Sequence, residues 1–186
     1  MIDVDTGERV RVDERRLLEL PLRAGDALAA GAVERLRAWQ RVDLAERRML
    51  RLLAVRARSQ AEVERRLGRL DLEPAEVGEI TGRLIGAGLI DDLATASTAV
   101  RRELRRGTGV GLIRARLEQL DVDPQAAAQA LDVAAAGDER ERAARVVRTR
   151  LGQPPWSRRD RARAAAHLLR RGYDADTVEA VLGIDE

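Results

Sequence analysis

Residues 66–74 read Arg-Leu-Gly-Arg-Leu-Asp-Leu-Glu-Pro, and residues 116–124 read Arg-Leu-Glu-Gln-Leu-Asp-Val-Asp-Pro. Five of the nine positions are identical, and the second copy begins 50 residues after the first. A more divergent third copy, His-Leu-Leu-Arg-Arg-Gly-Tyr-Asp-Ala, occupies residues 167–175. Self-similarity at a fixed period of this length indicates a repeat architecture. The chain is therefore predicted to contain three similar structural units.

Each copy has the pattern of a turn between two helices. Val63, Leu67 and Leu70 precede the first turn at i, i+4 and i+7, which is the spacing of one helix face. Pro74 suits the first position of the helix that follows. Apolar residues recur at helical spacing upstream as well, at residues 45–53. Each repeat is therefore predicted to have three helices, the last two joined as in a helix-turn-helix.

The predicted fold class is all-α, with three tandem three-helix repeats at residues 43–90, 91–137 and 138–186. An N-terminal extension, residues 1–42, precedes them. Apolar residues fall on even positions in its first part and predict a small β-hairpin: Ile2, Val4, Val10 and Val12. A helix is predicted from about residue 26 to about residue 40.

Composition excludes several kinds of chemistry. The 186 residues include no Cys and a single His, and all 34 basic residues are Arg. Thiolate metal sites, disulfides, a P-loop lysine and a Schiff-base lysine are therefore excluded. We expect no catalytic residues, no cofactor, no metal and no enzymatic activity. Without a long apolar run or a secretory leader, the chain is expected to be a cytoplasmic monomer that does not contact membranes.

Clusters of arginine are the candidate binding residues. The net charge is only +2, so an electropositive surface requires that charges segregate onto particular faces. Arginine forks bind phosphates and carboxylates in a bidentate manner. A solvated helix face with i, i+4 ion pairs is the alternative interpretation of such stretches. The predicted contact residues for a protein or DNA partner are Arg101, Arg102, Arg105, Arg106, Arg158, Arg159, Arg161 and Arg163.

Two other features have structural interpretations that we prefer to functional ones. Asp91 and Asp92 resemble paired carboxylates, but they are better explained as the N-cap and first turn of a helix. The glycine-rich segment 107–111 follows a helical pattern instead of a strand, so it lacks the context of a dinucleotide-binding loop. It is predicted to be a flexible loop between helices.

Four segments, taken together and in this order, resemble the RecX family of proteins that regulate the RecA recombinase. The resemblance extends over about residues 43–183. Its segments are Arg58–Leu67, Gly88–Asp92, Gly109 with Ile113 and Leu117, and Arg171–Asp174 followed by Val178 and Val181. The chain departs from the family pattern in the second repeat. Thr95 and Thr98 stand where aromatic residues are usual, and Val110–Leu112 stand where basic residues are usual.

The resemblance implies a regulatory protein of DNA repair, recombination and the SOS response. Such proteins bind RecA within the groove of the RecA–DNA filament and restrain its recombinase, ATPase and co-protease activities. The expected partner is the RecA filament, with single- or double-stranded DNA as a further contact.

Two alternatives remain open from the sequence. The repeats are compatible with an autonomous nucleic-acid-binding module, which would bind DNA without RecA and lose affinity steeply with salt. They are also compatible with a degenerate relative that folds but no longer acts on RecA.

Overall fold

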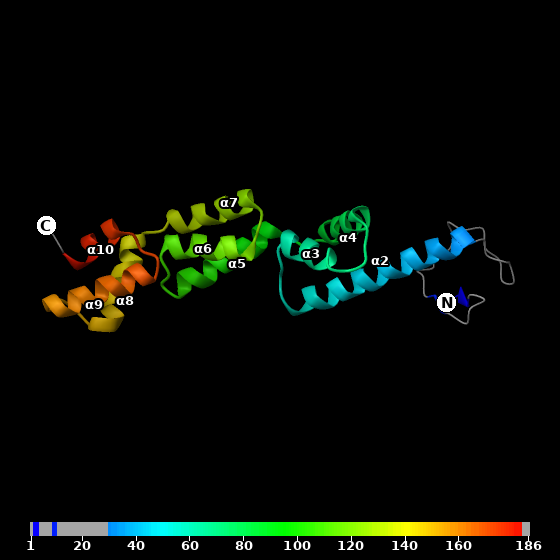
Figure 1. The fold of residues 1–186 in the computed structure, drawn as a ribbon. Helices are drawn as coiled ribbons and strands as arrows, with labels where there is room; N and C mark the ends of the chain where they lie inside the picture. The colour runs from blue at the N-terminus through cyan, green and yellow to red at the C-terminus, as the bar shows by residue number, and fades with distance from the viewer. Residues whose placement is uncertain (1, 4–8, 11–29, 184–186) are drawn as a thin grey trace. The chain divides into compact units, whose positions relative to one another are not determined.

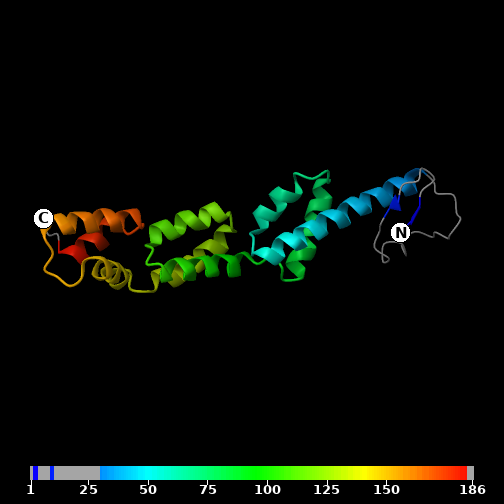
Figure 2. The same cartoon turned by 90° about the horizontal axis from the view of Figure 1, so that it is seen from below.

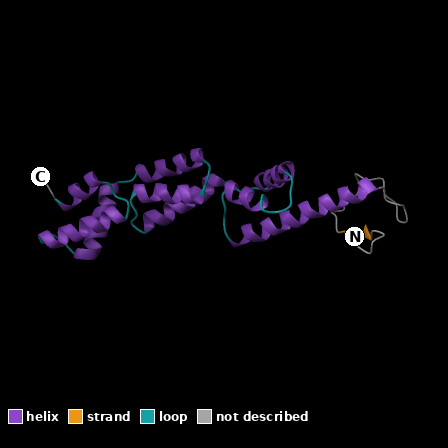
Figure 3. Ribbon diagram, viewed as in Figure 1, coloured by secondary structure: helices purple, strands orange, loops and turns teal. Residues whose placement is uncertain are grey.

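The computed structural model describes residues 2–3, 9–10 and 30–183, and this part of the chain is almost entirely helical (Figures 1 and 3). It divides into two compact units. The first unit comprises Met1–Ala57 with Glu62–Ile90, and the second comprises Arg58–Ala61 with Asp91–Glu186. The first repeat lies almost wholly in the first unit. The second unit holds the other two repeats.

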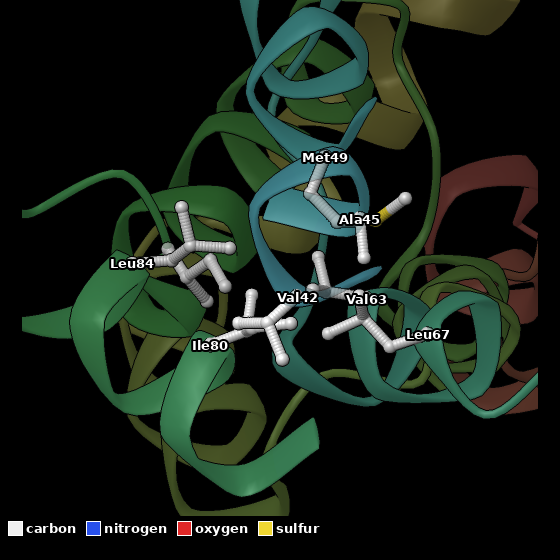
Figure 4. Close-up of a cluster of buried hydrophobic side chains, with 8 residues drawn as sticks. Val42, Ala45, Met49, Val63, Leu67, Ile80 and Leu84 are labelled. Carbon is white, nitrogen blue, oxygen red and sulfur yellow. The ribbon is translucent and has the colours of Figure 1, made fainter. Parts of the chain in front are cut away.

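The first repeat is built from α2 (Ala30–Val55), α3 (Gln60–Leu67) and α4 (Pro74–Gly86). Aliphatic side chains from the three helices converge on one core, as Figure 4 shows. The buried members are Val42, Ala45, Met49, Val63, Leu67, Ile80, Leu84 and Ile90. With no Phe in the chain, such a core depends on close interdigitation of branched side chains.

Helix α2 differs from the prediction at its C-terminal end. Its described part runs without a break from Ala30 to Val55, so the predicted end near residue 40 is wrong, and the predicted start near residue 26 lies outside the described residues. The physical reason is that neither Gly nor Pro occurs between residues 32 and 66, and nothing else interrupts the hydrogen-bond ladder. The boundary placed between residues 42 and 43 therefore falls inside a helix.

Two short strands lie near the start of the chain. Strands β1 (Ile2–Asp3) and β2 (Arg9–Val10) pair antiparallel, with Ile2 opposite Val10. The rest of the predicted hairpin, including Val4 and Val12, lies outside the described residues.

The second repeat comprises α5 (Asp92–Arg105), α6 (Val110–Leu120) and α7 (Pro124–Ala135). These three helices lie side by side in both views (Figures 1 and 2). The third repeat comprises α8 (Glu139–Leu151), α9 (Arg158–Arg170) and α10 (Ala175–Leu182). Each repeat has its own core. The second is built largely of Ala and small aliphatic residues, and the third includes buried Tyr173.

The repeated sequence motif has the same structural role in all three copies. Leu67, Leu117 and Leu168 are each at most 1% exposed and anchor the second helix of their repeats. The turn that follows needs a left-handed residue in the second and third copies. Asp121 supplies it with φ of 52° and Gly172 with φ of 84°. Asp and Gly are among the residues that tolerate this conformation best, so the sequence change between the two copies preserves the turn.

The glycine-rich segment 107–111 is held in place by hydrogen bonds from the main chain. The Gly109 amide donates to the Arg171 carbonyl oxygen at 2.9 Å, and the Gly111 amide donates to the Gly172 carbonyl oxygen at 3.1 Å. A Cβ atom on Gly109 would lie 2.5 Å from the carbonyl carbon of Gly172. The prediction of a flexible loop is therefore wrong. This segment forms a close joint between the second and third repeats.

Acidic residues at helix starts supply acceptors to amides elsewhere in the second unit. Glu139, the first residue of α8, accepts from the Val110 amide at 2.8 Å. Asp92, the first residue of α5, accepts from the Gln60 amide at 2.8 Å and from the Asp123 amide at 2.7 Å. The first amides of a helix have no partner within the helix, so these acids satisfy groups that would otherwise be orphaned. Asp91 caps α5 itself, as predicted.

Candidate functional site

The first predicted arginine cluster lies in the last turns of α5 and just beyond it. Arg102 and Arg106 both pair with Glu103, at 3.3 Å and 3.2 Å, while their side chains stay 54% and 61% exposed. Arg101 donates to the Thr98 hydroxyl at 3.2 Å. Arg105 is exposed and makes no ion pair or hydrogen bond with any described residue. The four arginines therefore do not form one equivalent set.

Glu103 is the buried carboxylate with which two arginines of this cluster pair. Its side chain is 1% exposed, accepts from the Thr108 hydroxyl at 3.1 Å, and also pairs with Arg116 from α6. A buried carboxylate is tolerated only when charges and hydrogen bonds surround it. Glu103 therefore offsets part of the positive charge predicted to face a partner, while its pair with Arg116 links α5 to α6.

A basic cavity of about 520 Å³ opens between the second and third repeats, within the second unit. Helices α5, α8 and α9 and the turns at residues 107 and 171 form its walls. No carboxylate is among the described residues that line it. Its charged lining consists of six arginines: Arg105, Arg106, Arg142, Arg145, Arg150 and Arg171.

The partners of these arginines determine which of them can receive a ligand. Arg171 donates to the carbonyl oxygens of Arg106 and Gly107, the second at 3.1 Å, and Arg142 donates to the Ala134 carbonyl oxygen at 3.2 Å. Main-chain carbonyl oxygens therefore hold these two guanidinium groups in position. Arg105 and Arg150 make no ion pair or hydrogen bond with described residues. The cavity therefore combines pre-positioned guanidinium groups with groups whose donors are open to a ligand.

His167 reports the electrostatic character of this cavity, which it lines. Its pKa is lowered from the ordinary value of 6.5, first by burial and then by the positive charges of Arg150, Arg171 and Arg170. The ring is consequently neutral at neutral pH. No acidic residue faces it among the causes of this shift, so a catalytic arrangement of His with a carboxylate is not formed here.

The second predicted cluster occupies a different surface. Arg158, Arg159, Arg161 and Arg163 lie on α9, and none of them lines the basic cavity. Arg161 instead lines a separate hollow of about 550 Å³ with Arg148 and Trp156. The half-buried Trp156 packs against the core of the third repeat.

The basic cavity thus contains only some of the predicted arginines, together with others that were not predicted. Arg105 and Arg106 were predicted and lie at the cavity, whereas Arg142, Arg145, Arg150 and Arg171 were missed. The spacing of Arg142, Arg145 and Thr149 marks one face of α8 and was a readable signal. Arg171 gave no such signal, because its position depends on contacts between repeats.

Other kinds of site find no support in the described part of the chain. No group of three or more His, Asp or Glu side chains there is arranged to hold a metal ion. None of the described helices has the length and apolar character needed to cross a membrane.

Comparisons with known proteins agree on one family. Residues 138–182 match the family described as RecX, third three-helix domain. A regulatory protein RecX from Mycobacterium sp. (strain KMS) is 34% identical over 143 residues, which cover 73% of this chain and 78% of that protein. The regulatory protein RecX of Leptothrix cholodnii is 35% identical over 135 residues, covering 73% of this chain and 85% of the relative.

Solved structures share the fold. A crystal structure of regulatory protein RecX superposes with a TM-score of 0.73 at 24% identity, over 94% of this chain and 87% of that one. RecX from Lactobacillus salivarius gives a TM-score of 0.65 at 23% identity, over 76% of this chain and 94% of that one.

Proposed function

Because this chain belongs to the RecX family of regulatory proteins, we propose that it binds the RecA–DNA filament and restrains the recombinase, ATPase and co-protease activities of RecA. The observation that carries this proposal is the 34% identity to a regulatory protein RecX across 73% of the chain. The protein acts by binding, without chemistry of its own, in the cytoplasm.

The α9 arginines are the proposed contact with the filament. Arg158, Arg159 and Arg161 lie in the first turn of the helix, where the backbone dipole disfavours positive charge. Cations at that position do not serve the stability of the helix. Two of them, Arg158 and Arg159, are exposed and have no described partner. Recognition of an anionic surface, either acidic side chains of RecA or DNA phosphates, accounts for their presence.

The exposed arginines of α5 provide a second proposed contact. Arg101 and Arg105 extend from the same end of α5 as Arg102 and Arg106, whose guanidinium groups stay more than half exposed while bound to Glu103. These side chains present positive charge without relying on flexible segments, because Glu103 is fixed by Thr108 and Arg116.

The test is the rate of ATP hydrolysis by cognate RecA on single-stranded DNA, measured with increasing amounts of the protein. We expect substoichiometric protein to lower the rate. The double variant Arg158→Glu/Arg159→Glu should require several times more protein for the same effect. Its thermal midpoint should stay level or rise, because negative charge at a helix N-terminus is favourable.

Arg140→Glu is the matched control, because Arg140 is an exposed arginine in the first turn of α8. It should inhibit as well as the unmodified chain. An unchanged effect of the double variant would remove the α9 site. No effect of the unmodified chain on ATP hydrolysis would reject the proposed function.

The autonomous DNA-binding alternative has the basic cavity in its favour. A DNA-only binding measurement at two salt concentrations separates the alternatives. Salt-sensitive DNA binding together with unchanged RecA hydrolysis would favour the autonomous module. No response in either assay would favour a degenerate relative.

A further inference from the structure

We propose that the basic cavity between the second and third repeats is a binding site for a compact polyphosphate, meaning several phosphate groups held close together. Phosphates of this kind occur in a nucleoside triphosphate and in inorganic tripolyphosphate, whereas a DNA strand carries one separated phosphate per nucleotide. The proposed site is separate from the α9 arginines and needs no RecA.

Charge density is the first argument. Six guanidinium groups surround a space of about 520 Å³ that no carboxylate lines, although Arg106 pairs with Glu103 and Arg145 with Glu141 outside it. The other four arginines of the lining have no carboxylate partner among the described residues, so an occupant with several negative charges would offset their mutual repulsion. Acidic side chains of a peptide carry one charge each on separate residues, whereas a polyphosphate carries at least one charge on every phosphorus. Guanidinium forks also match phosphate oxygens in a bidentate manner.

Pre-organisation is the second argument. Arg171 is held by the carbonyl oxygens of Arg106 and Gly107, and the Tyr173 hydroxyl donates to Gly107 at 3.0 Å as well. The Nε atom of Arg142 is buried without a hydrogen-bond partner in the described structure. The wall of the cavity is therefore set before a ligand arrives.

The remaining lining fits a nucleotide better than a bare inorganic ion. Leu104 and Val146 offer an apolar wall, and the Thr149 side chain lies beside them on α8. A sugar or base can lie against such a wall while the phosphates meet the arginines. Arg105 and Arg150, whose donors are not used by described residues, are the side chains that would close on the ligand.

The test uses isothermal titration of the whole chain, without RecA, against three probes: tripolyphosphate, ATP with Mg²⁺ removed, and a short oligothymidylate. Binding of tripolyphosphate or ATP is expected, and it should weaken as salt is raised. The variant Arg105→Ala/Arg150→Ala should weaken that binding about tenfold or more, because each arginine supplies a charge-assisted contact.

Arg114→Ala is the matched control, since Arg114 is an exposed arginine of α6 away from the cavity. It should bind like the unmodified chain. The thermal midpoints of all three proteins should agree, because the replaced side chains are exposed and have no described partners.

Each outcome decides the matter. Tripolyphosphate or ATP binding that the cavity variant loses identifies a free polyphosphate as the ligand. Oligothymidylate binding alone overturns the proposal, because it shows a site for the separated phosphates of a DNA strand. No binding of any probe, or binding equally strong in the cavity variant, overturns the proposal. The Arg158→Glu/Arg159→Glu variant leaves the cavity intact, and Arg105→Ala/Arg150→Ala leaves the α9 arginines intact, so the proposed function and this site can fail separately.

Discussion

Gly109 and Gly172 bring the main chains of two repeats into direct contact. A Cβ atom on Gly172 would lie 2.2 Å from the Leu112 amide nitrogen, and one on Gly109 would lie 2.5 Å from the Gly172 carbonyl carbon. The obstacle in both cases is backbone, which cannot rotate away as a side chain can. These two positions therefore accept Gly for steric reasons, and Gly172 has a positive φ in addition.

Gly109→Ala should destabilise the protein by roughly 1–3 kcal/mol, as overpacking in a close contact does. Gly78→Ala provides the contrast. Gly78 lies inside α4 with nothing within 4 Å of an added Cβ atom, so Ala should stabilise by about 0.5–1 kcal/mol. Denaturant unfolding followed by circular dichroism measures both. A Gly109→Ala variant as stable as the parent would contradict the joint described above.

His167 should make stability depend on pH. Its folded-state pKa is lowered, by burial first and then by Arg150, Arg171 and Arg170. The unfolded chain therefore takes up the proton first, so stability is lost as pH falls from above 6.5 through the folded pKa. Among the described residues, four more arginines line the same cavity, and no carboxylate does: Arg105, Arg106, Arg142 and Arg145.

Nuclear magnetic resonance can follow this titration without ambiguity, because His167 is the only His in the chain. Its pKa should lie below that of a free imidazole. The variant His167→Gln should lose the decrease in stability between pH 7.5 and 5.5. The carboxyl of Asp174, whose pKa is lowered from 3.8 mainly by the Thr177 amide, stays ionised over that range and does not interfere. An ordinary pKa for His167 would contradict the burial and charge described here.

At the scale of helices, local sequence patterns predicted most of what the structure contains. Caps and turns such as Asp91, Asp121-Val122-Asp123 and Pro124 were readable because their physics involves only neighbouring residues. The end predicted for helix α2 near residue 40 was wrong, because no Gly or Pro interrupts the helix there. The joint at Gly109 could not be read, because its partners are about 60 residues away in the sequence.

Helix starts in the second unit are capped in two ways, and the difference can be measured. Helix α9 is capped by its own Ser157, which accepts from the Asp160 amide at 3.1 Å, whereas the α6 amide of Val110 depends on Glu139. Ser157→Ala and Glu139→Ala should each cost about 1 kcal/mol. Only Glu139→Ala should speed hydrogen exchange at Val110. Equal exchange at Val110 in the two variants would contradict the capping across repeats.

At the scale of the molecule, some of the cavity's arginines could be predicted from the sequence, but the cavity itself could not. Arg105 and Arg106 were found from local charge density, and Arg142 and Arg145 follow one face of α8. The cavity itself results from the joint, which places Arg171 beside the end of α5. The α9 arginines were grouped correctly on one helix, but the fold places them outside the cavity.

The second and third repeats should open as one cooperative unit, because main-chain hydrogen bonds at Gly109 and Gly111 connect them. Native-state hydrogen exchange should give the buried amides of Leu117 and Leu168 the same free energy of opening. The amides of Gly109 and Gly111 should be protected, unlike those of a free loop. Two well-separated opening free energies would show that the repeats unfold independently.

The acid at the start of α8 also has a consequence for biosynthesis. Val110 and its acceptor Glu139 are separated by 29 residues, and a ribosome adds about 5–20 residues per second. The second repeat therefore leaves the ribosome with its core residues complete and one helix end still without its acceptor. While only residues up to 137 have emerged from the ribosome, the Val110 amide still lacks its acceptor, and the emergence of Glu139 supplies it.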